Sequence, residues 1–397
     1  MVNKVAKYED ITDVQLANEL KNNGYNDVSV KKSGNKFKVT FSSGNVYTIK
    51  DDGTVEKYEK TEPTAIYAKL YTDGTLILSS TDYTDTTRTI AENGDYGDVS
   101  QKVNYYSEEV NGPPSLKGDY PGWLNGAAIY YPGGNSKIKK LIIKDKIVPI
   151  NTSYWFCGSA ITEIDGLEKM DTSNITDMSS MFAFCQGLSN LNLSNFDTSN
   201  VTNMSRMLYC CSGIETLNVS SFDTSKVTDM NYMFASNGSL TQIIGIEQFN
   251  TSNVTNMEAM FGGTSLTSLS ISNFDTTKVT NMQGMFSGNM KLNNLDLSNF
   301  DTRNVEDMSA MFNQCENLKN VNLSSFDTSK VTQMYSMFGY CKNLENLNLK
   351  NFNTSKVTQM NGMFDYVTAP IIVGENWNSA MTESATGYNG TFEVENN

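Results

Sequence analysis

The chain has 397 residues, enough for two or three domains, and 30 Lys and Arg against 44 Asp and Glu give a net charge of −14. Phosphate recognition needs clustered Lys and Arg, so we expect no nucleic-acid partner. Histidine is absent, which removes histidine-based acid–base catalysis, Ser-His or Cys-His nucleophiles and histidine metal ligands. No apolar run of about 18 residues and no signal peptide are visible, so we expect no membrane span, and the chain is either not exported or a processed or truncated form.

The first 60 residues predict a small α+β unit. Apolar residues between Val14 and Leu20 follow helical spacing, so a short amphipathic helix is predicted over 13–23, ended by Gly24. Alternating segments predict strands at 28–30, 36–41 and 46–49, with turns at 33–35, 43–45 and 52–53.

Residues 61–137 predict a β-rich N-terminal module. The pair Asp73-Gly74 between two apolar runs is a strong hairpin signal. The segment 138–143 then predicts the first strand of the region that follows. An enzymatic function would have to use the loops of this module, where Glu108, Glu109 and Asp119 are available carboxylates without a catalytic pattern.

One segment, Asp197-Thr-Ser-Asn-Val-Thr-Asn-Met-Ser-Arg-Met-Leu208, recurs with little change and dominates the rest of the chain. A degenerate copy around Phe156 precedes the regular ones. Such a unit cannot bury its apolar side alone, so successive copies must stack. The eight regular copies begin at Asp171, Asp197, Asp223, Asn250, Asp275, Asp301, Asp327 and Asn353.

Each copy predicts a strand, a turn and a short helix. The strand is Leu188-x-x-Leu191-x-Leu193, with Leu191 and Leu193 inward and Asn192 outward. Thr202 is placed to cap a helix that carries Met204, Met207 and Leu208, with both methionines on one face. A Phe column is expected in the core, formed by Phe196, Phe222, Phe249, Phe274, Phe300, Phe326 and Phe352.

The predicted fold class is therefore an α/β, β-rich solenoid. It is a leucine-rich-repeat-like parallel stack of about nine turns, preceded by the small α+β and β-hairpin units. The predicted domains are 1–60, 61–137, the solenoid 138–369 and a C-terminal cap 370–397. Trp123 and Trp377 flank the solenoid and are expected to cover its ends.

Two repeat positions can be interpreted either as structural positions or as a metal site or disulfide. The acidic column Asp171, Asp197 and Asp223 could bind calcium between turns, but Asn250 in the same position favours Asx-turns, because asparagine keeps the turn bond and loses the charge. Four cysteines also share one position, as the pairs Cys185–Cys211 and Cys315–Cys341. Either pair is near enough for a disulfide, yet buried free thiols are favoured; zinc is not expected, since no Cys-x-x-Cys exists.

The outward strand residues form the candidate binding strip. Their amide and hydroxyl groups suit hydrogen bonding to carbohydrate or protein, although each alone is more simply a solvated strand position. Tyr209, Tyr232, Tyr335 and Tyr340 offer a second surface on the helix side. The strip consists of Asn190, Asn192, Asn218, Ser270, Asn294, Asp296, Asn320, Asn322, Asn346 and Asn348.

Residues 64–377 resemble the BspA-like leucine-rich repeat surface proteins of bacteria. Asp171-Thr-Ser-Asn-Ile-Thr-Asp-Met178, Met181-Phe-x-x-Cys185-x-x-Leu188 and Tyr154-Trp-Phe156 carry the resemblance. Residues 1–60 more weakly resemble the globular part of pilin-like proteins of Gram-positive bacteria, through Phe41-Ser-Ser-Gly-Asn-Val-Tyr-Thr-Ile49 and Asp52-Gly-Thr-Val55. The apolar N-terminal helix that defines pilins is absent from the sequence.

These resemblances imply a non-enzymatic, extracellular or cell-surface adhesin. Its ligand would be a host protein or a glycan, with pilus subunits as a further partner, and no cofactor is expected. The rival hypothesis is a structural spacer or a pilus or filament subunit that displays the solenoid.

Overall fold

The computed structural model describes residues 12–22, 28–33, 36–41, 46–50, 55–57, 65–99, 105–107, 115–117, 137–378, 387–388 and 392–395. Several predictions fall outside these residues: the helix end at Gly24, the turns at 34–35, 43–45 and 52–53, the carboxylates Glu108, Glu109 and Asp119, and Trp123.

The N-terminal unit has the helix and strands that the sequence predicted. Helix α1 (Asp13–Asn22) begins after Thr12, whose hydroxyl accepts the Gln15 N–H at 3.2 Å while the Gln15 side chain accepts the Thr12 N–H at 2.8 Å. Leu16 and Leu20 of this helix pack with the sheet residues Phe37, Val39 and Ile49. The sheet is antiparallel in the order β1 (Val28–Ser33), β2 (Lys36–Phe41), β3 (Val46–Lys50) and β4 (Val55–Lys57).

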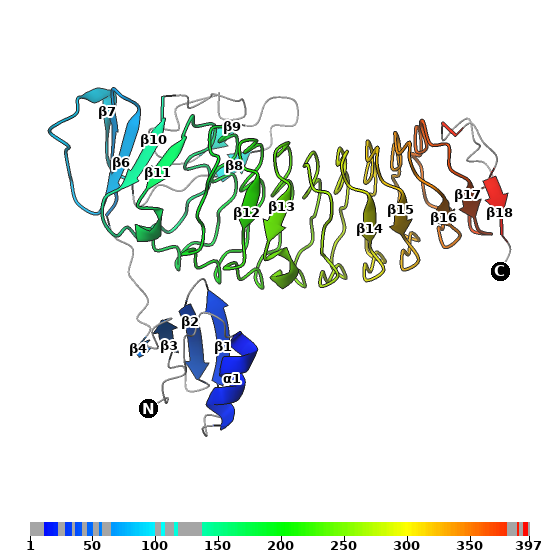
Figure 1. Cartoon of the computed structure of the whole chain (residues 1–397), viewed down its shortest axis with the longest axis horizontal. Helices are drawn as coiled ribbons and strands as arrows, with labels where there is room; N and C mark the ends of the chain where they lie inside the picture. The colour runs from blue at the N-terminus through cyan, green and yellow to red at the C-terminus, as the bar shows by residue number, and fades with distance from the viewer. Residues whose placement is uncertain are drawn as a thin grey trace.

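The predicted hairpin of the next module is also confirmed. Strands β5 (Tyr67–Tyr71) and β6 (Thr75–Ser79) pair antiparallel, and Gly74 between them has a φ of +87° that suits glycine. Strand β6 continues as a parallel neighbour of β10 (Lys140–Ile143), so this sheet runs directly into the repeats (Figure 1). Its full order is β11 (Glu163–Asp165), β10, β6, β5 and β7 (Ile90–Asp98), and β8 (Tyr105–Ser107) pairs separately with β9 (Ser115–Lys117).

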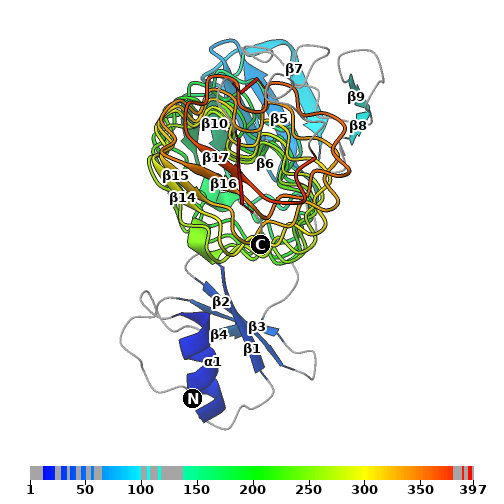
Figure 2. The same cartoon turned by 90° about the vertical axis from the view of Figure 1, so that its right-hand side faces the viewer.

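The repeats lie side by side along the long axis of the molecule (Figure 1) and follow nearly the same path when seen end-on (Figure 2). Parallel bridges join each repeat to the next, as between Asp177 and Asn203 and between Asn203 and Asp229. Short strands follow the same direction: β12 (Thr216–Asn218) pairs with β13 (Gln242–Ile244), β14 (Asn294–Asp296) with β15 (Asn320–Asn322), and β16 (Leu347–Leu349) with β17 (Ile371–Val373) and then β18 (Phe392–Val394).

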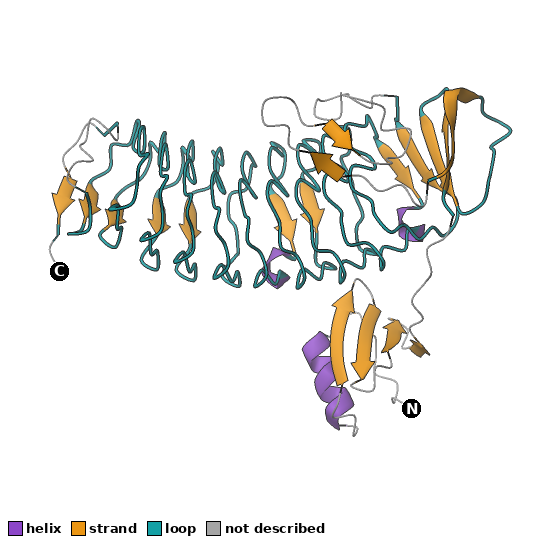
Figure 3. Ribbon diagram, turned by 180° about the vertical axis from the view of Figure 1, so that it is seen from behind, coloured by secondary structure: helices purple, strands orange, loops and turns teal. Residues whose placement is uncertain are grey.

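The predicted fold class, an α/β leucine-rich-repeat-like solenoid, is wrong. The structure is only 5% helical, and the described strands form separate sheets of two to five strands, none of which closes into a solenoid. Outside α1 the described helical elements are the 3-10 turns η2 (Leu167–Lys169) and η3 (Ile246–Gln248) (Figure 3). The predicted strand at 188–193 does not form, although Leu191 and Leu193 are buried and Asn192 is exposed as expected.

The predicted helix at Met204–Leu208 is replaced by consecutive turns. Arg206 and Cys210 have φ values of +53° and +56°, which no right-handed helix tolerates. Alternate N–H groups then point in different directions: the Met207 N–H bonds within the repeat to the Met204 carbonyl, whereas the Arg206 N–H bonds to Asn231 of the next repeat. The chain thus exchanges helical hydrogen bonds for bonds between repeats.

Thr202 does not cap a helix either. Its hydroxyl donates to the Thr176 carbonyl of the preceding repeat at 3.2 Å. The local turn is instead closed by Asn203, whose Oδ1 accepts the Ser205 N–H at 2.9 Å. The side chain that closes the turn is therefore the Asp or Asn directly before the first methionine in six of the repeats.

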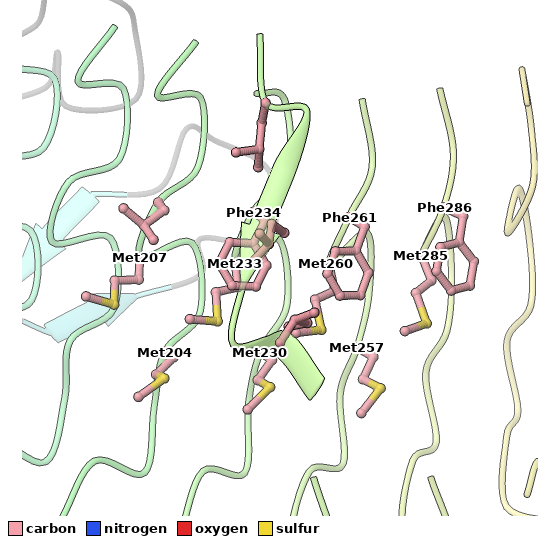
Figure 4. Close-up of a cluster of buried hydrophobic side chains, with 14 of the residues drawn as sticks. Met204, Met207, Met230, Met233, Phe234, Met257, Met260, Phe261, Met285 and Phe286 are labelled. Atoms are coloured by element: carbon pink, nitrogen blue, oxygen red, sulfur yellow. The ribbon is translucent and has the colours of Figure 1, made fainter. Parts of the chain in front are cut away.

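The core consists of ladders of identical side chains. The two methionine columns and the predicted Phe column are buried, with exposures of at most 5%. A second Phe column lies beside the methionines (Figure 4). Its rings stack from repeat to repeat, with centroids 5.8 Å apart for Phe286 and Phe312 and 5.3 Å apart for Phe312 and Phe338. Trp377 packs against Phe364 and Phe392 at the C-terminal end, with centroids 6.2 Å and 5.4 Å away.

The shared cysteine position is a hydrogen-bond donor site, and all six cysteines are free thiols. Cys185 donates to the Phe156 carbonyl at 3.0 Å and Cys211 donates to the Phe182 carbonyl at the same distance. In another copy Asn237 donates from Nδ2 to the Leu208 carbonyl at 2.9 Å. Cysteine and asparagine can replace each other at this position because both can donate to a carbonyl of the preceding repeat.

The acidic column forms the predicted Asx-turns. Oδ1 of Asp197 accepts the Ser199 N–H at 3.0 Å, and Oδ1 of Asn250 accepts the Ser252 N–H at 3.1 Å. Aspartate and asparagine therefore accept the same backbone hydrogen bond at this position.

Candidate functional site

All ten residues of the predicted binding strip are exposed. The intervening Leu217, Leu295 and Leu347 are at most 4% exposed, so the alternation of inward and outward side chains that the sequence predicted is confirmed. The strip thus follows one face of successive repeats, with amide and hydroxyl groups and one carboxylate toward solvent.

Half of the strip residues also have a local structural role. Each accepts, through Oδ1, the backbone N–H two residues further on, at 3.0 to 3.1 Å, and so forms an Asx-turn. Hydrogen bonds from Ser298 hold the pKa of the Asp296 carboxyl below its usual value, so this group is charged at neutral pH. The five residues are Asn192, Asn218, Asp296, Asn322 and Asn348.

The other strip residues are the better candidates for ligand contacts. No Asx-turn involves Asn190, Asn294, Asn320 or Asn346 among the hydrogen bonds of the described residues. Asn320 donates from Nδ2 to Oδ1 of Asn294 at 3.5 Å, which links equivalent amides of neighbouring repeats. Their replacement should leave the strand ends intact.

A cavity of about 330 Å³ lies at the N-terminal end of the strip. Asn190 and Asn192 line it together with Glu163 and Glu168, over an apolar wall that includes Leu167. Glu163 also pairs with Lys140 of the adjoining strand. The cavity therefore offers carboxylate and amide oxygens, amide donors and a small apolar surface within one hollow.

The 3-10 turn η2 explains why the hollow forms there. It follows Gly166, which has a φ of +82° and lies so near β10 that a Cβ atom would be 2.2 Å from the Ile143 carbonyl oxygen. The next segment, 188–193, forms no strand and does not pair with β11. The second such turn, η3, follows Gly245 and also precedes a segment without a strand, 266–271.

A larger cavity, of about 630 Å³, lies between the N-terminal unit and the repeats. Nζ of Lys31 contacts Oδ2 of Asp223 and Oγ of Ser225, both at 2.8 Å. Burial acts to raise the pKa of Asp223, but hydrogen bonds from Lys31 and Ser225 outweigh it and lower this pKa. No strip residue lines this cavity.

The four tyrosines of the second predicted surface do not form one continuous group in the structure. Tyr232 and Tyr335 are half-buried: the Tyr232 hydroxyl donates to Glu258 at 2.7 Å, and Gln283 donates to the Tyr335 hydroxyl at 2.7 Å. Tyr209 packs edge-on against Tyr232 with ring centroids 5.8 Å apart. Tyr340 instead stacks on the exposed Tyr366. Sequence reasoning missed Tyr366, although it occupies the position of Tyr340 in the next copy and could have been found by that signal.

Neither a metal cluster nor a membrane-spanning helix occurs among the described residues. No group of three or more Cys, Asp or Glu side chains there is arranged to hold a metal ion. No helix there combines the length and the apolar character needed to cross a bilayer.

The family described as "Mycoplasma protein of unknown function, DUF285" matches three overlapping stretches, 151–262, 239–321 and 291–395. Together they run from 151 to 395, which is more than half of the 397 residues. The chain belongs to this family. The DUF285 region contains all ten strip residues and both 3-10 turns, whereas the N-terminal unit and the β5–β6 hairpin precede it. No curated protein matches the chain.

Proposed function

We propose that this protein is a non-enzymatic recognition module, an adhesin that binds a host protein or a glycan along the strand face. The observation that carries the proposal is the row of exposed polar side chains, which a buried ladder of leucines holds at regular intervals. Such a row favours affinity from many individually weak polar contacts on a rigid surface.

The cavity beside η2 supports the same proposal. It adds a hollow of about 330 Å³ to an otherwise open face, and Asn190 and Asn192 belong to both. A ligand that lies along the strip could place one group in this hollow, where carboxylates and amides are close together. The resemblance to BspA-like surface proteins agrees with an extracellular or cell-surface location.

The binding experiment compares the full chain with two variants on arrays of glycans and extracellular matrix proteins. Asn320→Lys with Asn346→Lys adds two bulky charges to the strip without removing an Asx-turn, and binding should fall at least about tenfold. The matched control, Ser236→Lys with Asn361→Lys, adds the same charge at exposed positions in the turns that carry the methionines, away from the strip, and should bind normally. An equal loss in both variants, or a normal strip variant, would contradict the strand-face site.

The location is tested separately in the native cell. Mass spectrometry of the fractionated envelope and cytosol, with surface biotinylation of intact cells, should find the protein in the envelope and labelled. A protein confined to the cytosol would overturn the adhesin proposal even if the purified chain bound a ligand.

A further inference from the structure

The exposed Tyr366 stacks on the half-buried Tyr340 among the turns of the last repeats. Tyr340 and Tyr366 occupy equivalent positions, and their ring centroids lie 4.5 Å apart at an interplanar angle of 24°. Tyr366 is 60% exposed and is one of few large apolar side chains so open to solvent in the described part of the chain. The hydrophobic effect does not account for a ring in this place.

The backbone beneath both rings is unfavourable for tyrosine. Tyr340 and Tyr366 have φ values of +62° and +61°, in the left-handed region that favours glycine. Two other repeats place Gly263 and Gly288 at this position, with φ values of +68° and +74°. Phe184 shares the position too, but it is half-buried and packs edge-on against Tyr209, so a packing reason exists there. Cys210, Ser236 and Gln314 also have a positive φ at this position, so the repeat requires this conformation and the backbone does not select tyrosine. Tyr366 packs on Tyr340 alone among the aromatic rings of the described residues and leaves most of its surface open to solvent, which is the feature that points to a ligand.

Charged and amide groups lie beside the Tyr340 ring. Nζ of Lys342 lies 5.8 Å from the Tyr340 ring centroid and 2.8 Å from Oε1 of Glu316. Both side chains are partly open to solvent, at 47% and 39% exposure. Asn343 donates from Nδ2 to the Glu316 backbone carbonyl at 2.8 Å, which fixes the neighbouring segment. Hydrogen-bond donors and acceptors therefore border an exposed aromatic surface.

We propose that Tyr340 and Tyr366 form a stacking shelf for the pyranose ring of a neutral saccharide, with Lys342 and Glu316 hydrogen-bonding to its hydroxyls. One face of a pyranose carries C–H groups that pack on an aromatic ring, and its hydroxyls pair with charged donors and acceptors. Planar nucleobases would also stack, but the net charge of −14 opposes the phosphates that accompany them. This saccharide shelf lies outside the strand face, so it is a second site independent of the proposed function.

The test is saturation-transfer NMR on the full chain with methyl β-glucoside, methyl β-galactoside, N-acetylglucosamine and their β-linked oligomers as probes. At least one probe should receive saturation at its ring C–H protons. Tyr366→Gly should abolish this transfer, and Tyr366→Trp should retain it. Absence of transfer to every probe, or transfer that persists in Tyr366→Gly, would overturn the saccharide shelf.

Stability separates binding from packing at the same residue. Glycine suits a φ of +61°, so Tyr366→Gly should lose the probe signal while its melting temperature stays unchanged. A marked fall in melting temperature would make Tyr366 a packing residue and sink the proposal.

Lys342→Met should reduce probe affinity about tenfold with the shelf intact. Asn320→Lys with Asn346→Lys should leave the probe signal normal, which separates this site from the strand face.

Discussion

The hydroxyl of Thr302 holds both backbone groups of Asp327 in the next repeat. It donates to the Asp327 carbonyl at 2.9 Å and accepts the Asp327 N–H at 2.8 Å. The same arrangement recurs between Thr276 and Asp301. The threonines of this column are at most 1% exposed, so no water can replace them. The column comprises Thr172, Thr198, Thr224, Thr251, Thr276, Thr302, Thr328 and Thr354.

Thr302→Val should therefore be costly although it conserves shape. Valine leaves the partly buried N–H and carbonyl of Asp327 without their partner, which should lower the free energy of unfolding by about 1–3 kcal/mol. Urea unfolding followed by circular dichroism measures the effect. Thr267→Val, at an exposed position, is the control and should change stability by less than about 0.5 kcal/mol. Equal effects of the two variants would mean that the Thr302 hydrogen bonds add nothing.

The buried thiols should be chemically inert in the native state. Burial raises the pKa of Cys185 and of Cys315 to about 12, so at mildly alkaline pH these groups remain neutral thiols. Iodoacetamide labelling read by mass spectrometry should modify the half-buried Cys210 first and Cys315 only after unfolding. Prompt native labelling of Cys315 would contradict its burial.

The same shift predicts alkaline sensitivity. The folded pKa of Cys315, about 12, exceeds its ordinary value of 9.0, so its stabilisation is complete below about pH 9 and is lost as pH rises toward 12. Cys315→Asn, which keeps a donor as Asn237 and Asn289 do, should remove this site's share of the loss. Melting temperatures of both proteins across this range provide the measurement.

Asp229→Asn should stabilise the protein at neutral pH. Burial raises the pKa of Asp229, and this outweighs the hydrogen bond from Asn231, so the charged carboxylate is disfavoured in the fold. A raised pKa gives stability that is present below the unfolded value and lost as pH rises, and asparagine avoids that loss while keeping the turn bond. We expect a gain below about 1 kcal/mol in urea unfolding.

Asp327→Asn is the matched control for this prediction. The pKa of Asp327 is lowered, chiefly by hydrogen bonds from Ser329, so its contribution is present above the unfolded pKa and lost as pH falls. Asparagine should not stabilise this site at neutral pH. A gain at both sites would show that general relief of the net negative charge, rather than burial of Asp229, is responsible.

Two glycine-to-alanine substitutions can separate the energetic cost of a left-handed backbone from the cost of a steric clash. Gly284 has a φ of +60°, and a Cβ there would meet only Ala259 and Ser287, both at 3.8 Å. Gly284→Ala should therefore cost only about 1 kcal/mol, from conformation alone. Gly166→Ala adds a clash with the Ile143 carbonyl and should cost about 3 kcal/mol or more. Thermal unfolding should rank the two in this order, and the reverse order would refute the contact argument.

Much of the packing was predictable because it repeats. The Met and Phe columns, the inward leucines and the outward Asn192 follow from spacing alone. The helix was mispredicted because methionines three residues apart share one side both in a helix and in consecutive turns. Gly284 and Gly362 at the position of Arg206 were the signal for a left-handed residue, since an interior helix position disfavours glycine.

The site could be predicted only in outline. Exposure of the strip followed from alternation, but the cavity lies between η2 and the segment 188–193, where the regular strands are interrupted, and no periodic argument contains that interruption. Gly166 before Leu167 and Gly245 before Ile246 mark the two irregular repeats, and this shared pair was the available signal. The threonine column also went unrecognised, because a constant polar residue beside a turn suggests solvent contact rather than burial.

The threonine contacts between repeats involve only backbone atoms of the partner residue, Asp327 in one pair and Asn353 in another. The threonine column therefore needs no complementary side chain in the next repeat. After excision of residues 276–301, Thr302 would directly follow Asp275, which already bonds to Thr251. The column of threonine hydroxyls would therefore stay in register and unbroken. The threonine column thus permits a change of length by whole repeats, because its contacts stay the same at every junction.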